Sequence, residues 1–340
     1  MLTLPRFTAA TVQTAPAFLD PAATVAKAAS LIREAAANGA ELVVFPEVFV
    51  AGYPYWSWIA DPVACSPWFD RLVRASILVP GPEIAQLCDA ARGAGVHVII
   101  GVNERSPVSL GTLYNTLVFI GPDGTILGRH RKLVPTWAEK LTWAPGDGAG
   151  LKVYDTAIGR LGGLACGENT NTLARFALLA QGELVHAASY IALPVAPPDY
   201  DMAEAIKVRA MAHSFEGKVF TIVSCSTVSE EIIAAMEQLV PDARARLERR
   251  NSAFSGVIGP DGRVVGTPLI DDEGIVYAEI DLNRCIQPKQ MHDIIGHYNR
   301  FDIFDLRVDT TPRQPVTFAP APAPAIVPDA AADPLAAAPL

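Results

Sequence analysis

The chain has 340 residues, of which 50% are hydrophobic, and its 36 acidic and 27 basic side chains give a net charge of −9 at pH 7. This acidic balance argues against a nucleic-acid partner, because binding to phosphates requires a basic face. No apolar stretch approaches the roughly 18 uncharged residues of a membrane helix, and the first residues lack the pattern of a signal peptide, so we expect a cytoplasmic protein without a membrane partner.

The cysteines and histidines argue against a disulfide framework and a metal centre. Five cysteines are scattered along the chain without a Cys-x-x-Cys pair, which indicates reduced thiols. The six histidines include neither a His-Glu-x-x-His nor a His-x-His spacing, so we expect no bound metal. The cysteines are Cys65, Cys88, Cys166, Cys225 and Cys285.

From the N-terminus, apolar runs typical of strands alternate with segments typical of helices. Asp20 followed by Pro21 indicates a helix N-cap with proline in the first turn, and Asn38-Gly39 indicates that this helix ends in a left-handed residue. The order of elements fits an α/β, or layered α+β, fold. We expect strands at 7–14, 41–47, 96–102, 184–190, 219–224 and 275–280, and helices at 21–38, 83–94, 202–216 and 230–249.

One internal repeat bears on the architecture. Residues 118–128 read VFIGPDGTILG, and residues 256–266 read GVIGPDGRVVG. In both, a β-rich run meets a Gly-Pro-Asp-Gly turn and returns as another β-rich run, which is typical of a hairpin. Two similar hairpins, one in each half of the chain, indicate two matching sheets packed face to face with helices outside, although convergent turn chemistry could also produce the match.

Two charged positions follow apolar strands in the first half of the chain. Glu47 ends the run ELVVFPE, and Lys132 ends the basic run RHRK, which is followed by LVPT. Taken alone, Glu47 could be a solvated carboxylate at the end of a sheet, and the basic run could be a surface patch.

The most informative segment is RLGGLACGEN at residues 160–169. An apolar run leads to Cys166 and breaks at once into a polar stretch, before a helix at 172–182 with Asn171 or Thr172 as its N-cap. A thiol at such a strand-to-helix turn can stand clear of the backbone, and nearby helix N–H groups favour the nucleophilic thiolate. A lone cysteine is more often a small buried hydrophobe, so the rest of the chain must decide.

Together these three segments resemble the nitrilase superfamily of carbon–nitrogen hydrolases, whose triad is Glu, Lys and Cys in that order. The matching motifs are FPE at Glu47, RKLVPT at Lys132 and GxxxCxEN at Cys166. The resemblance covers residues 5–310. It implies a four-layer α-β-β-α sandwich over residues 1–311, with Glu47 as general base, Lys132 as a cation that stabilises negative charge, and Cys166 as nucleophile.

Two further segments resemble the nitrilase branch of this superfamily. They are PTWAEKLTW at 135–143, followed by a GDG turn, and GHYNR at 296–300. The residue after the cysteine is usually Trp in nitrilases and is Gly167 here. Losing an indole removes roughly 100–150 Å³ beside the nucleophile, so we expect a bulky nitrile, preferably an arylacetonitrile or another aliphatic-aryl nitrile.

The resemblance implies covalent chemistry without a cofactor or metal. Cys166 would attack the nitrile carbon to give a thioimidate, and water would then release ammonia and a carboxylic acid through a thioester, with the Gly167 N–H in the oxyanion hole. Glu139 has two interpretations. The matching family residue faces the active site, whereas Thr136-x-x-Glu139 is also a helix capping box. We assign Glu139 to the catalytic site.

The remaining site residues are assigned by their neighbourhood. We place Tyr53, Trp137, Gly167 and Asn169 on the substrate-binding surface. Glu168 and Asn169 are expected to support the turn rather than react, and Asn115 is expected to be structural.

The resemblance also implies a homo-oligomer, a dimer that nitrilases commonly extend into helical filaments. Residues 293–300 are a candidate contact, or alternatively a segment that caps its own sheet. Residues 312–340 contain eight prolines and ten alanines, a composition that indicates a disordered tail.

Two alternatives to a nitrilase stay open. One is a sibling enzyme of the same superfamily, either a cyanide dihydratase or hydratase or an amidase. The other is a non-catalytic assembly protein, since a fold alone does not fix a function. The presence of Glu47, Lys132 and Cys166 together argues against the second alternative.

Overall fold

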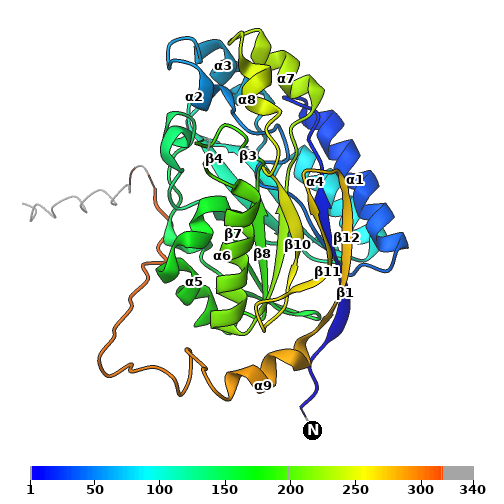
Figure 1. Cartoon of the computed structure of the whole chain (residues 1–340), viewed down its shortest axis with the longest axis vertical. Coiled ribbons are helices and arrows are strands. Elements are labelled where there is room, and N and C mark those ends of the chain that lie inside the picture. The colour runs from blue at the N-terminus through cyan, green and yellow to red at the C-terminus, as the bar shows by residue number, and fades with distance from the viewer. Residues whose placement is uncertain (1, 198, 315, 317–340) are drawn as a thin grey trace, which may run out of the picture.

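The computed structural model describes residues 2–197, 199–314 and 316. Two six-stranded sheets pack face to face, and helices cover both outer faces (Figure 1). The predicted four-layer α-β-β-α sandwich is therefore confirmed.

The first sheet is built by β1 (Arg6–Gln13), β2 (Leu42–Val44), β3 (His97–Arg105), β4 (Leu113–Ile120), β5 (Ile126–Arg131) and β12 (Gly274–Asp281). Its strand order is β12-β1-β2-β3-β4-β5. The last strand of the chain pairs antiparallel with the first, while β1, β2 and β3 run parallel to one another. Helices α1 (Pro21–Ala37) and α4 (Pro82–Ala94) bury their apolar sides on the outer face of this sheet.

The second sheet is built by β6 (Tyr154–Thr156), β7 (Gly159–Ala165), β8 (Val185–Tyr190), β9 (Phe220–Cys225), β10 (Phe254–Ile258) and β11 (Val264–Ile270). Its order is β11-β10-β9-β8-β7-β6, and β7, β8 and β9 are parallel. Helices α5 (Thr172–Leu179) and α6 (Met202–Gly217) cover its outer face.

The core between the sheets is formed by side chains that alternate along the inner faces of the strands. Leu42 and Phe119 from the first sheet meet Leu161, Val185 and Phe220 from the second, and each is at most 1% exposed. Burying one such side chain contributes about 1.5–3 kcal/mol, so this layer fixes how the two sheets sit on each other.

Shorter helices lie at the two ends of the sandwich (Figure 1). One end carries four helices that share an aromatic cluster with the ends of the strands. The opposite end carries α9 (Ile286–Lys289), close to the N-terminus. The four helices are α2 (Trp56–Ile59), α3 (Ser66–Ala75), α7 (Glu230–Glu237) and α8 (Ala243–Leu247), and the 3₁₀ turns are η1 (Trp137–Leu141), η2 (Gly148–Gly150), η3 (Cys166–Thr170) and η4 (Leu282–Cys285).

Most of the predicted elements are confirmed. Asp20 caps α1 by accepting a hydrogen bond from the Ala23 N–H, and Gly39 follows the helix at φ +85°. The two repeats form hairpins β4–β5 and β10–β11, each at the edge of its own sheet, and their turns place Gly124 and Gly262 at positive φ. The N-cap of α5 is Asn171, one of the two alternatives.

The single helix predicted for residues 230–249 is wrong. The structure has two helices, α7 and α8, separated by residues 238–242. Pro241 lies in this break, and proline has no N–H to donate and its ring clashes with the preceding turn. The break between the two helices therefore follows from the presence of Pro241.

No helix among the described residues is long and apolar enough to cross a membrane. The tail predicted from residue 312 onward lies outside the described residues, apart from 312–314 and 316. The domain boundary at residue 311 stays a prediction.

Candidate active site

The three residues of the predicted triad follow the ends of three different strands. Glu47 comes shortly after β2, Lys132 directly after β5 and Cys166 directly after β7. The first two strands belong to one sheet and β7 to the other, and the Glu47 N–H donates to the Tyr190 carbonyl at the end of β8, 3.2 Å away. The site therefore lies where the ends of the two sheets meet.

Lys132 is a buried cation between two carboxylates. Its Nζ lies 2.8 Å from Oε1 of Glu47 and 2.7 Å from Oε2 of Glu139, and its side chain is 1% exposed. Burial lowers the pKa of Lys132, but the charges of Glu139 and Glu47 outweigh burial and raise that pKa well above its ordinary value. Lys132 is thus a buried cation held by two carboxylates.

Glu47 has one oxygen that is fully engaged and one that is open. Oε1 accepts hydrogen bonds from Lys132 Nζ and, at 2.6 Å, from Asn115 Nδ2. Oε2 is buried and has no hydrogen-bond partner among the described residues. Burial raises the pKa of Glu47 above its ordinary value of 4.5, despite the opposing charge of Lys132. A fixed carboxylate with an open lone pair and a raised pKa suits a general base.

Asn115 is a site residue that the sequence analysis took to be structural. Its side chain donates to Glu47, and its carbonyl accepts from the Lys132 N–H at 2.8 Å. The predicted hairpin could have indicated this role of Asn115, because the pairing of Thr116 with Arg131 places Asn115 beside Lys132. Asn115 thus aligns both members of the ion pair.

Cys166 lies on a strained turn. Its φ is +51°, a left-handed conformation that costs a non-glycine residue about 1–3 kcal/mol and often marks functional sites. The side chain is 7% exposed. Burial, followed by the charge of Glu47, raises the pKa of the Cys166 thiol well above its ordinary value, and the Lys132 charge does not reverse this.

The expected effect of helix N–H groups on the thiolate does not dominate in the resting protein. Cys166 opens the short turn η3, and α5 begins only at Thr172. Burial and the neighbouring carboxylate outweigh any helix effect, so the thiol must lose its proton to a base during reaction.

Glu168 supports the turn, as expected. Its carboxylate accepts from the backbone N–H of Ala165 at 3.0 Å and of Leu133 at 2.6 Å, and it pairs with His130 Nε2 at 2.9 Å. One buried side chain thereby joins the segment of the nucleophile to the segment of Lys132.

The capping interaction predicted for Glu139 is confirmed, and the same carboxylate contacts Lys132; its catalytic assignment stays a prediction. Oε2 accepts from the Thr136 N–H at 2.7 Å, which is the capping interaction, and also from Lys132 Nζ. Oε1 accepts from the Tyr53 hydroxyl at 2.9 Å. The cap holds the carboxylate in place, and Lys132 makes it part of the site.

The four residues predicted for the substrate surface take different positions. Trp137 is 73% exposed, and Gly167 adjoins the nucleophile. Tyr53 is buried with its hydroxyl on Glu139, and Asn169 is buried with its amide on backbone carbonyls. Contact of these residues with a substrate stays a prediction.

A cavity of about 860 Å³ lies against the turn that carries Glu139. Trp58 and Trp137 form part of its lining and pack edge to face, with their ring centres 5.5 Å apart. Trp58 Nε1 donates to the Tyr53 hydroxyl at 2.7 Å, and that hydroxyl donates to Glu139. A short hydrogen-bonded chain therefore connects the aromatic wall of the cavity to the buried carboxylates.

Comparison with known proteins gives a consistent set of relatives. The sequence profile of the Carbon-nitrogen hydrolase family matches residues 8–290. A nitrilase of Paraburkholderia phymatum is 37% identical over 91% of this chain and 88% of that protein. An aliphatic nitrilase of Rhodococcus rhodochrous is 38% identical over 92% and 85%, and nitrilase 1 of Arabidopsis thaliana is 36% identical over 90% and 88%.

Solved structures share the fold at lower identity. The NitFhit protein of C. elegans superposes with a TM-score of 0.69 at 19% identity, covering 91% of this chain and 68% of that chain. Nit3 of Saccharomyces cerevisiae, a member of branch 10 of the nitrilase superfamily, gives 0.66 at 19% identity, covering 85% and 95%.

Proposed function

The chain belongs to the carbon–nitrogen hydrolase family and is an enzyme of its nitrilase branch; on this basis we propose that it converts an arylacetonitrile, or another aliphatic-aryl nitrile, to a carboxylic acid and ammonia. The observation that carries the chemistry is the buried cluster of Glu47, Lys132 and Glu139 at the turn of Cys166. The catalytic roles and the substrate class are parts of the proposal.

The first half of the reaction forms the covalent intermediate. Glu47, through its open Oε2, takes the proton from the Cys166 thiol as sulfur bonds to the nitrile carbon. The proton passes to the nitrile nitrogen, and a thioimidate results. Lys132 and the Gly167 N–H stabilise negative charge as it develops on nitrogen, and one such donor is worth about 3 kcal/mol.

The second half consumes two molecules of water. Glu47 removes a proton from the first water as its oxygen adds to the thioimidate carbon, and the protonated nitrogen leaves as ammonia, which gives a thioester. The second water adds in the same way and expels the sulfur, which regains its proton. The sum is RCN + 2 H₂O → RCOOH + NH₃, and no redox step is required.

The substrate assignment is supported by the aromatic cavity and by Gly167. The cavity next to Glu139 has Trp58 and Trp137 in its wall, and aryl rings pack favourably on aromatic side chains. Two relatives from Rhodococcus rhodochrous are named aliphatic nitrilases, so an aliphatic nitrile is the second candidate substrate.

Ammonia release from a panel of substrates tests this assignment. Phenylacetonitrile is expected to give the highest kcat/KM, ahead of benzonitrile, a short aliphatic nitrile, cyanide and phenylacetamide. Preference for the aliphatic nitrile supports the second candidate. Preference for cyanide or phenylacetamide identifies one of the sibling activities, and no release from any compound contradicts the proposed substrate class.

Gly167→Trp is expected to lower kcat/KM for phenylacetonitrile far more than for a short aliphatic nitrile. A Cβ at residue 167 would lie 3.1 Å from the Thr136 hydroxyl, so an indole would extend toward the turn that carries Glu139. Gly167→Ala is the control and should change both substrates within about threefold, since this φ tolerates a side chain and only Thr136 must shift. Equal losses for Gly167→Trp on both substrates would show that residue 167 shapes the backbone rather than the pocket.

We also propose that the chain forms a homo-oligomer, with a dimer as the basic unit and a filament as its extension. Helices α5 and α6 leave Leu173, Val208 and Phe215 more than half exposed on the outside of the second sheet. The predicted contact segment 293–300 includes Tyr298, which is 59% exposed. Light scattering of the purified chain measures the assembly, and a monomer contradicts it. A cytoplasmic location stays a prediction.

A further inference from the structure

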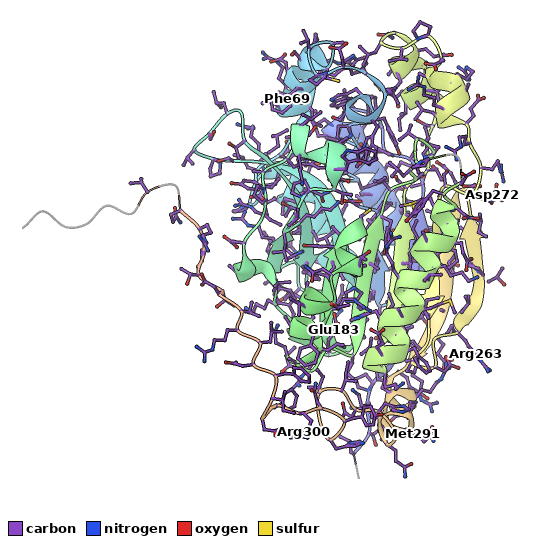
Figure 2. All side chains as sticks on the ribbon, turned by 60° about the vertical axis from the view of Figure 1, so that its left-hand side comes forward. Phe69, Glu183, Arg263, Asp272, Met291 and Arg300 are labelled. Atoms are coloured by element: carbon purple, nitrogen blue, oxygen red, sulfur yellow. The ribbon has the colours of Figure 1, made fainter. Side chains whose placement is uncertain are left out.

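Behind the second sheet lies a buried polar cluster that the proposed chemistry does not use. Glu183 precedes β8, His186 lies on β8 and His213 lies on α6. Glu183 Oε1 is 2.8 Å from His186 Nδ1, and its Oε2 is 3.0 Å from His213 Nε2. Figure 2 shows Glu183 within the body of the molecule, whereas Met291 and Arg300 lie at its edge.

The sequence leaves room for this carboxylate. Gly162 on β7 has no side chain, and a Cβ there would lie 2.2 Å from Glu183 Oε1. Any larger residue at position 162 would displace the carboxylate. The second glycine of the GGLAC segment is Gly163. A Cβ at this position would lie 2.7 Å from the carbonyl oxygen of Ala187, so the close approach of the Ala187 backbone requires glycine here.

The cluster reaches the nucleophile through Asn169. The Asn169 Nδ2 donates to the carbonyls of Leu164 and Cys166 at 3.3 and 3.0 Å, and its Oδ1 lies 2.8 Å from His186 Nε2. Carbonyl oxygens only accept hydrogen bonds, so the amide nitrogen must face them and the amide oxygen must face His186.

This orientation makes the Asn169 amide oxygen the group that faces His186. Both ring nitrogens of His186 therefore face acceptors, Glu183 on one side and Asn169 on the other. Burial raises the pKa of Glu183, but the charge and hydrogen bonds of His186 and those of His213 outweigh it and lower that pKa to about 2. Burial and the charge of His186 lower the pKa of His213 to about 4, with a further contribution from Arg175. At neutral pH Glu183 is therefore a carboxylate and His213 a neutral imidazole.

The carbonyl that Asn169 holds belongs to the peptide that carries the proposed oxyanion donor. The Cys166–Gly167 bond is trans, so the Cys166 carbonyl and the Gly167 N–H lie in one plane and point in opposite directions. Fixing the carbonyl therefore fixes the direction of the N–H. Cys166 is also at a strained φ, which persists only where surrounding contacts enforce it.

We propose that Glu183, His186 and Asn169 are positioning residues that orient the Cys166–Gly167 peptide and so aim the Gly167 N–H at the reacting atom. Glu183 orients the His186 ring, His186 orients the Asn169 amide, and Asn169 holds the peptide. This inference rests on the proposed function of Cys166 and Gly167. Hydrogen bonds account for the spacing of Glu183, His186 and His213 without a bound cation.

Two substitutions at one position separate positioning from stability. In His186→Gln the side-chain amide nitrogen takes the place of Nε2 and keeps the contact with Asn169. In His186→Asn the shorter side chain places its amide nitrogen at the position of Nδ1, so only the contact with Glu183 is kept. We expect His186→Gln to hold kcat within about threefold. We expect His186→Asn to lower kcat about ten- to hundredfold and to leave KM within about twofold. A loss of this size in rate is expected when a catalytic group is misplaced by about 1 Å.

His213→Gln is the matched control, because it disturbs the same buried cluster on the side away from Asn169. It should lower the thermal midpoint as much as His186→Asn does and leave kcat within about twofold. Equal kcat losses in all three variants, or losses that follow the thermal midpoint, overturn the proposal. Loss of wild-type activity on treatment with EDTA and its recovery with Zn²⁺ would overturn it in favour of a metal site.

Asn169→Asp decides the matter where His186→Asn does not fold. It keeps the shape and the acceptor for His186 but replaces the donor that holds the Cys166 carbonyl, so the same fall in kcat is expected. An unchanged kcat overturns the proposal. A wild-type protein that releases no ammonia from any nitrile contradicts the proposed function instead, so the two failures are distinguishable.

Discussion

Cys166→Ala is expected to reduce ammonia release to below about 10⁻⁴ of the wild-type rate while the fold remains intact, since removal of a catalytic nucleophile has effects of this size or larger. The side chain is small and 7% exposed, and its loss should cost about 1 kcal/mol of unfolding free energy. Circular dichroism and thermal unfolding measure the fold. Mass spectrometry of wild-type protein quenched during turnover should show the mass of one acyl group on the peptide that contains Cys166.

Cys225→Ala is the matched control for this experiment. Cys225 is a second fully buried thiol in the same apolar cluster as Cys166, and burial raises its pKa as well. It lies at the end of β9 and has no role in the proposed mechanism, so activity should stay within about twofold. An adduct on another cysteine, or appreciable turnover by Cys166→Ala, contradicts the assignment.

The secondary structure was largely predictable because its signals are local. The cap at Asp20 and the two Gly-Pro-Asp-Gly turns depend on neighbouring residues only, and each is confirmed. The repeat also indicated two sheets, because each hairpin ends one of them. The single helix predicted at residues 230–249 was wrong because Pro241 interrupts it.

The site was predictable only as a set of residues and not as a set of contacts. Glu47 and Lys132 are 85 positions apart, and only the resemblance to a family brought them together before the structure did. The raised pKa of the Cys166 thiol could not be predicted, because it depends on burial and on the charge of Glu47, which are tertiary properties. The GxxxCxEN motif contains Asn169, but nothing in the sequence connects Asn169 with His186, 17 positions further along the chain.

The Glu139 carboxylate serves two purposes, as a helix cap and as a partner of Lys132. A capping interaction fixes a carboxylate against its own turn, and a fixed carboxylate loses little conformational entropy when it also pairs with Lys132. The desolvation cost of the buried Lys132 charge is offset by two carboxylate partners rather than one. Removing Glu139 would leave Lys132 with one carboxylate partner and would break a buried hydrogen bond to its Nζ, which is costly in a buried site.

Glu47→Gln is expected to lower kcat/KM by about 10²–10⁴-fold, the range associated with loss of a general base. The substitution keeps the shape of the side chain, and the amide oxygen can still accept from Lys132 and Asn115 in the place of Oε1. What it removes is the basic oxygen Oε2. The wild-type kcat/KM should also rise with pH through an acid limb, because only ionised Glu47 can accept the thiol proton.

That limb should lie above pH 4.5, since burial raises the pKa of Glu47 above this ordinary value, and it should disappear in Glu47→Gln. Glu273→Gln is the control: Glu273 is a half-buried carboxylate that accepts from Thr14, Ala15 and Thr227, outside the catalytic cluster. It should retain both the limb and a kcat/KM within about twofold. If the acid limb survives in Glu47→Gln at the same pH, another group sets it, and the thiol proton is taken by a base other than Glu47.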